Sequence, residues 1–97
     1  MPDKHVTEEE RVRLCQALGD SIAGGWKQFY SISNAQVLAI AHAQLFLVQQ
    51  SHALLYPQVR CICYAGVYGQ IGIARHFQER DEEALQAYHC SYIAALE

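Results

Sequence analysis

The chain has 97 residues, of which 52% are hydrophobic and 18% are charged, and its formal net charge is −3. This length allows one small domain, residues 1–97, and the apolar content excludes a disordered or low-complexity chain. Its few cations are scattered along the sequence, whereas nucleic-acid binding needs clustered positive charge, so we expect no nucleic-acid partner. We expect residues 1–7 to form a flexible N-terminus.

The first predicted helix covers residues 8–22. Thr7 and Glu10 have the spacing of a capping box, and acidic residues in the first turn suit the helix dipole. Gly24 and Gly25 are expected to end this helix. The aromatic stretch that follows, residues 26–32, is interpreted as a packed connector.

The second predicted helix covers residues 34–55, with Ser33 and Gln36 as another capping box. It is apolar nearly all round, and residues 28–59 contain no Asp, Glu, Lys or Arg. Such a helix is normally buried, yet a chain of this length can hardly enclose it alone. Two alternatives follow: a tight monomeric bundle with this helix at its centre, or a helix partly covered by a partner or a second copy. The burial argument favours the second.

The third and fourth predicted helices cover residues 57–79 and 82–95, with Pro57 at a first helical position. Gly66, Gly69 and Gly72 each cost a helix interior about 1 kcal/mol relative to Ala, so they predict the close approach of another helix. Since no strand pattern stands out, we expect an all-α fold with a four-helix array.

Five positions in the last two predicted helices resemble the tetratricopeptide repeat. They match its first aromatic, its Leu-Gly pair, its Ala and its second aromatic: Tyr68, Ile71, Gly72, Ala84 and Tyr88. The resemblance covers residues 65–96 and departs from the pattern at Arg75, where Tyr is usual, and at Leu96, where Pro is usual. It implies that the array ends in a tetratricopeptide-like antiparallel hairpin. A single repeat cannot bury its own face, so the rest of the chain or another protein would cover it.

No catalytic or metal-binding motif stands out. The sequence lacks H-x-x-x-H, G-x-S-x-G, a phosphate loop and a C-x-x-C pair. His76 and Glu79 could share a helix face, which we interpret as a surface contact. We therefore predict a protein that is not an enzyme and that uses no cofactor or metal.

The cysteines and the apolar runs bear on location. Four cysteines in a chain without an apolar signal segment favour the reducing cytoplasm. The longest charge-free apolar segment, residues 37–48, is too short to cross a bilayer as a helix, so we expect no membrane insertion.

The function predicted from these features is protein binding. The chain is similar in size, charge and helical style to small acidic chaperones of bacterial secretion systems. We expect a helical adaptor or small chaperone that binds a partner protein through the uncharged face of the second helix and the C-terminal hairpin. The alternative is a self-associating, homodimeric structural or regulatory protein. If His52 is buried, it could make association pH-sensitive. The candidate partner-binding residues are His52, Leu38, Leu45, Phe46, Val48, Tyr64, Tyr68 and Arg75.

Overall fold

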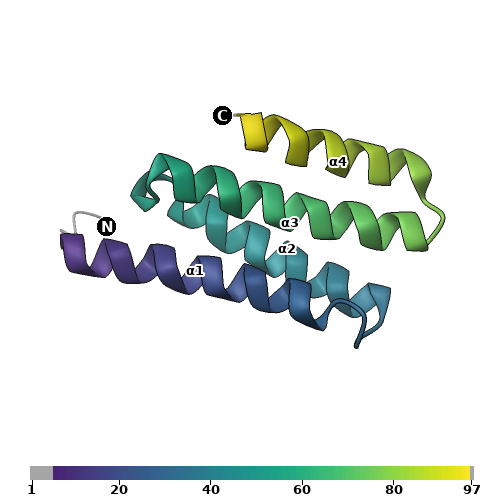
Figure 1. Ribbon diagram of the computed structural model, residues 1–97, viewed down its shortest axis with the longest axis horizontal. Helices are drawn as coiled ribbons and strands as arrows, with labels where there is room; N and C mark the ends of the chain where they lie inside the picture. The colour runs from purple at the N-terminus through teal and green to yellow at the C-terminus, as the bar shows by residue number, and fades with distance from the viewer. Residues whose placement is uncertain (1–5, 97) are drawn as a thin grey trace.

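The computed structural model of the protein describes residues 6–96. Four α-helices, α1 (Glu8–Gln28), α2 (Asn34–Ser51), α3 (Pro57–Phe77) and α4 (Asp81–Leu96), follow one another, with a 3₁₀ turn η1 (His52–Leu54) after α2. No strand occurs in these residues, and the predicted all-α fold is confirmed. Successive helices run antiparallel, and α3 lies at the centre with α4 on its outer side (Figure 1). Most of the expected flexible N-terminus, residues 1–5, lies outside the described residues.

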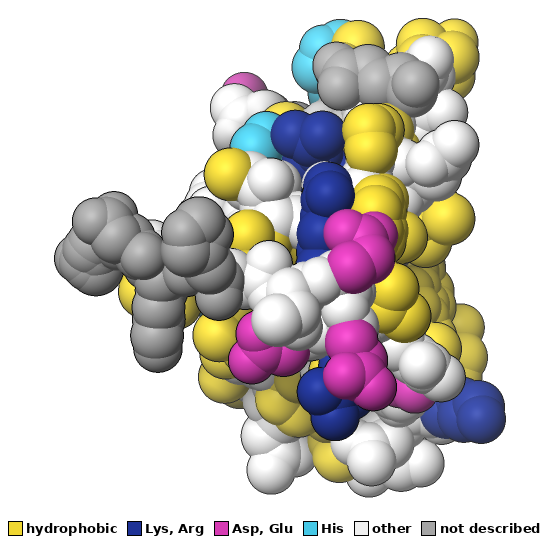
Figure 2. All heavy atoms as spheres, turned by 90° about the vertical axis from the view of Figure 1, so that its left-hand side faces the viewer, with side chains coloured by type: hydrophobic (Ala, Val, Ile, Leu, Met, Phe, Trp, Pro, Cys, Tyr) yellow, Lys and Arg dark blue, Asp and Glu magenta, His cyan; other side chains and the backbone are white. Residues whose placement is uncertain are grey.

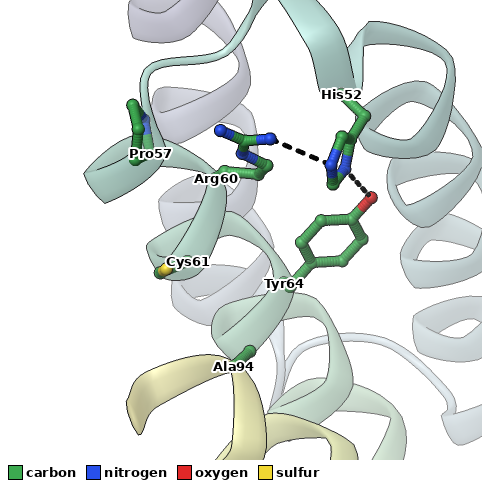
Figure 3. A pocket seen from close by; sticks show the side chains of 6 residues that line it. All are labelled: His52, Pro57, Arg60, Cys61, Tyr64 and Ala94. Atoms are coloured by element: carbon green, nitrogen blue, oxygen red, sulfur yellow. Dashed lines mark hydrogen bonds between the residues drawn. The ribbon is translucent and has the colours of Figure 1, made fainter. Parts of the chain in front are cut away.

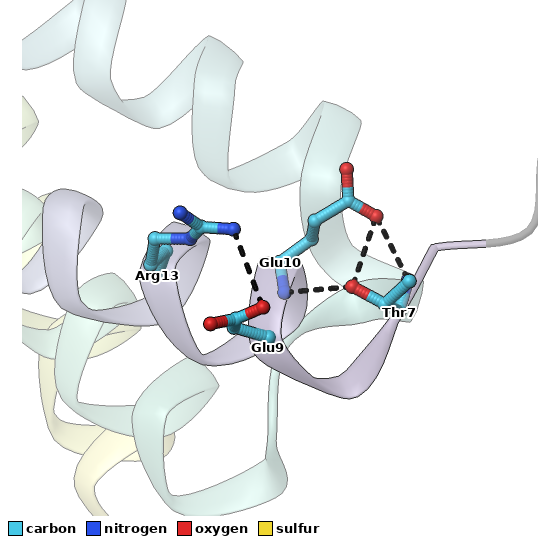
Figure 4. Close-up of polar contacts among 4 residues, drawn as sticks. All are labelled: Thr7, Glu9, Glu10 and Arg13. Atoms are coloured by element: carbon cyan, nitrogen blue, oxygen red, sulfur yellow. Dashed lines mark hydrogen bonds and ion pairs between the residues drawn. The ribbon is translucent and has the colours of Figure 1, made fainter.

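Both predicted capping boxes form. At the start of α1, the Glu10 backbone N–H donates to Thr7 Oγ1 over 3.1 Å, and the Thr7 backbone N–H donates to Glu10 Oε1 over 2.9 Å (Figure 4). Ser33 and Gln36 exchange the same pair of bonds at the start of α2. These side chains satisfy backbone donors that the first turn leaves without helical partners.

The expectation that Gly24 and Gly25 end the first helix is wrong, because α1 continues to Gln28. No glycine among residues 6–96 has the positive φ that would stop a helix. Gly25 instead gives room to a buried amide: a Cβ at this position would lie 2.9 Å from Oε1 of Gln70. The chain leaves α1 at Phe29, whose side chain is only 3% exposed.

The second helix is also shorter than predicted. It ends at Ser51, and η1 leads to Leu55, which is fully buried. Tyr56 is extended (φ −64°, ψ 145°), as a residue before a proline usually is. The turn allows Pro57 to begin α3 and still places Leu55 in the core.

The predicted close approach of other helices to the α3 glycines is confirmed. A Cβ on Gly66 would lie 2.8 Å from Ile22 of α1, and one on Gly72 would lie 2.5 Å from the Tyr88 ring of α4. A Cβ on Gly69 would lie 3.1 Å from Cζ2 of Trp26 in α1. The missing side chains therefore let α1 and α4 pack closely against two different sides of α3.

The helices α3 and α4 pack on each other more extensively than any other pair. Glu79 makes the turn between them with a positive φ of 62°. The Ser91 hydroxyl of α4 donates to the Ala65 carbonyl of α3 over 2.8 Å, and Ala84 is buried between the two helices. This pairing does not test the tetratricopeptide relationship, which stays a prediction.

Candidate protein-binding groove

One face of α3 forms the floor of a groove that has α4 along one side, with η1 beside one end and α2 beside the other. Three hollows adjoin along it, with volumes of about 360, 430 and 280 Å³. The first and second share Tyr64 and Ala94, and the second and third share Tyr68 and Cys90. We call this continuous depression the α3 groove. Its floor is a stripe at helical spacing: Arg60, Tyr64, Tyr68, Ile71 and Arg75.

A hydrogen-bonded chain of side chains closes one end of the α3 groove. Arg60 Nη1 lies 2.9 Å from His52 Nε2, and His52 Nδ1 lies 2.9 Å from Tyr64 Oη (Figure 3). Because a guanidinium only donates, Nε2 is the acceptor in this contact, which leaves Nδ1 to donate to the Tyr64 hydroxyl. The Tyr64 hydroxyl therefore keeps its own proton for another acceptor.

Two stacked tyrosines form the centre of the floor. The ring centroids of Tyr64 and Tyr68 lie 6.3 Å apart with an angle of 19° between the planes, and both side chains are half-buried. Burial raises the pKa of Tyr64, opposed by the Arg60 guanidinium. Burial also raises the pKa of Tyr68, with a smaller contribution from Cys90. Both rings therefore present neutral hydroxyls and apolar faces, which suits contact with another protein.

The other end of the α3 groove contains Arg75. Its Nη1 donates to Gln78 Oε1 over 3.3 Å, and its side chain is half-buried. The wall beside it contributes His42 and Leu45 from α2 and Glu83 from α4. Glu83 Oε1 forms an ion pair with Arg80 Nε over 2.5 Å, so the negative charge of Glu83 is already compensated.

The predicted partner-binding residues divide into three groups. Leu45, His52, Tyr64, Tyr68 and Arg75 all line the α3 groove. The other three do not.

Two of those three lie in the core. Leu38 is 7% exposed and Val48 is fully buried, so the folded chain itself covers them and we no longer assign them to a partner surface. Phe46 is 59% exposed but lies on α2 outside the α3 groove. His52 is exposed rather than buried, because η1 takes it out of the apolar face that a continuous helix would give it.

Sequence reasoning missed Arg60, Cys61 and Cys90, which also line the α3 groove. Arg60 stands four residues before Tyr64 and eight before Tyr68, so the helical spacing of the stripe was the signal that could have found it. The two cysteines are free thiols.

The end of the molecule near η1 brings basic and histidine side chains together. Figure 2 shows these basic and histidine side chains in contact, beside a column of hydrophobic side chains along the right-hand edge.

Within residues 6–96, no three His, Cys, Asp or Glu side chains gather closely enough to hold a metal ion. None of the helices in this part of the chain is both long and apolar enough for a membrane span.

Comparisons with protein-family models, with curated proteins and with solved structures found no match to this chain.

Proposed function

We propose that this protein is a non-catalytic, cytoplasmic adaptor or small chaperone that binds a partner protein in the α3 groove. The observation that carries this proposal is the pair of stacked, half-buried tyrosines, Tyr64 and Tyr68, in a depression that α3 forms with α4. Aromatic side chains in such settings often dominate the energy of protein–protein binding.

The balance of charge in the α3 groove supports the same proposal. Its centre has no Asp, Glu, Lys or Arg among residues 6–96, and the hollow there is lined by the two tyrosines and by His89, Cys90, Ile93 and Ala94 of α4. When a partner displaces water from such a surface, few charged groups lose their hydration, so the cost in free energy is small. A partner that offers apolar side chains would therefore gain binding energy along the floor.

A matched pair of tyrosine variants tests the proposal. Tyr68→Ala removes a ring from the floor, whereas Tyr92→Ala removes one from an exposed position of α4 outside the α3 groove. Wild type and both variants are immobilised, exposed to lysate of the native cell, and compared by quantitative mass spectrometry. We expect proteins retained by wild type and Tyr92→Ala to be lost from Tyr68→Ala, with affinity for the purified partner lowered by about tenfold or more.

Circular dichroism verifies that both variants are folded. Equal retention of every protein by the two variants would contradict the proposal, because a groove that binds a partner cannot be indifferent to its central ring.

Self-association is a second candidate function, favoured by the outward face of α2. Ile40, Phe46 and Leu47 are all exposed there without a charged neighbour on the helix. Apolar side chains that gather on a surface often mark an interface. Sedimentation equilibrium of wild type and Phe46→Asp tests this candidate: a dimer that Phe46→Asp dissociates supports it, and a monomeric wild type refutes it.

A further inference from the structure

The two arginines of the α3 groove stand at opposite ends of its floor. Arg60 and Arg75 are 15 positions apart on one helix, which corresponds to about 22 Å, or about four helical turns. Both side chains are half-buried and both line hollows of the groove. Neither forms an ion pair with any residue from 6 to 96.

Each guanidinium keeps most of its donors available. Arg60 uses one N–H on the His52 ring, and Arg75 uses one on the Gln78 side-chain amide, although a guanidinium has five N–H donors. Among residues 6–96, Glu83 is the only acid that lines the α3 groove, and it is paired with Arg80. A partly desolvated arginine without a carboxylate favours an acidic group of a binding partner.

The form of the occupant follows from the backbone groups that the groove can offer. The walls and floor are α-helices, whose backbone N–H and C=O groups are used internally, and no strand edge occurs among residues 6–96. An extended segment seated here would lose water from its backbone without gaining hydrogen bonds in return. An α-helix brings its backbone already satisfied, and helix-in-groove docking is a common mode of recognition.

Resting on the proposed function, we infer that the α3 groove takes an amphipathic helix of a partner protein. The apolar face of this helix covers Tyr64 and Tyr68, and an acidic residue near each end of that face meets Arg60 or Arg75. These acidic residues are separated by about 14 or 15 positions, because the partner helix has the same rise per residue as α3.

Selection from a displayed library of helical peptides of about 20 residues, which span about 30 Å, tests this inference. The library is panned in parallel on wild type, on Arg60→Glu/Arg75→Glu, and on Arg13→Glu. The last variant makes the same kind of charge change at an exposed residue of α1 that pairs with Glu9. Selected peptides are then synthesised with a fluorescent label, and their affinities are measured by anisotropy on all three proteins and on Tyr68→Ala.

We expect wild type and Arg13→Glu to select Asp or Glu at two positions about four turns apart, and the double variant to select Lys or Arg there. Mismatched pairs of peptide and protein should bind about tenfold more weakly than matched pairs. A proline at the peptide's centre should weaken binding by a similar factor, because it breaks the helix.

Three outcomes would overturn the inference. Peptides that need Tyr68 but have the same charge preference on all proteins would refute the pairing with arginines and leave the proposed function standing. Peptides that tolerate the central proline would refute the helical occupant alone. The absence of any binder that depends on Tyr68 would refute this inference and the proposed function together.

Discussion

The closeness of α3 and α4 at Gly72 gives the most direct test of the packing. In Gly72→Ala, the new Cβ would lie 2.5 Å from Cδ1 and Cε1 of Tyr88, well inside van der Waals contact. Overpacking of this kind costs about 1–3 kcal/mol, whereas Ala in place of Gly stabilises a helix interior by about 1 kcal/mol. We expect a net loss of about 1 kcal/mol in the free energy of unfolding, or about 4–8 °C in Tm.

Gly24→Ala is the matched control for this change. Gly24 lies within α1, and a Cβ there would meet nothing within 4 Å. Only the helix-propensity term applies, so this variant should gain about 0.5–1 kcal/mol. Urea unfolding followed by circular dichroism measures both free energies, with the m-value as a check on two-state behaviour. If Gly72→Ala gains as much stability as Gly24→Ala, then α4 does not pack on α3 as described.

The remaining predictions concern the core and the dependence of stability on pH. Leu55→Ala should lower the free energy of unfolding by about 2–5 kcal/mol, because Leu55 is fully buried. Phe46→Ala should change it by less than about 0.5 kcal/mol, since this ring is mostly exposed; equal effects in chemical denaturation would contradict the assigned burial. Burial raises the pKa of Cys63, Tyr64 and Tyr68, so folding favours their neutral forms. Their contribution is complete below about pH 8.5, near the ordinary pKa of a thiol, and is lost as pH rises through the folded-state values. Denaturation curves between pH 8 and 11 should show stability falling with pH, and a flat profile would refute this sign.

Features that act within one turn of helix could be predicted from sequence. Thr7 and Ser33 cap their helices by contacts three residues away, so their roles depend on nothing distant. Features that depend on tertiary packing could not be predicted in the same way. Gly25 lies within α1 and leaves room for the Gln70 side chain from α3, and the two residues are 45 positions apart in sequence.

Part of the candidate site could be predicted from sequence, because helical spacing is also local information. Tyr64, Tyr68 and Arg75, three of the predicted partner-binding residues, line the α3 groove because their spacing places them on one face of α3, and their binding role stays a prediction. Leu38 and Val48 were misassigned because α2 has no charged residue to mark its outward side. Its apolar pattern therefore indicates burial without indicating the direction of burial.

The dependence of α4 on a single neighbour has a consequence for the motions of the molecule. Among the described residues, α4 buries only Ala84 and Ala87, and α3 is the one helix it packs on extensively. Its detachment as a unit would break the most extensive interface of the molecule but no other extensive one, and would leave α1, α2 and α3 in contact, so we expect any sub-global opening and early amide exchange to begin at α4. Because α4 forms one side of the α3 groove, such an opening would widen the groove while the other three helices stay packed.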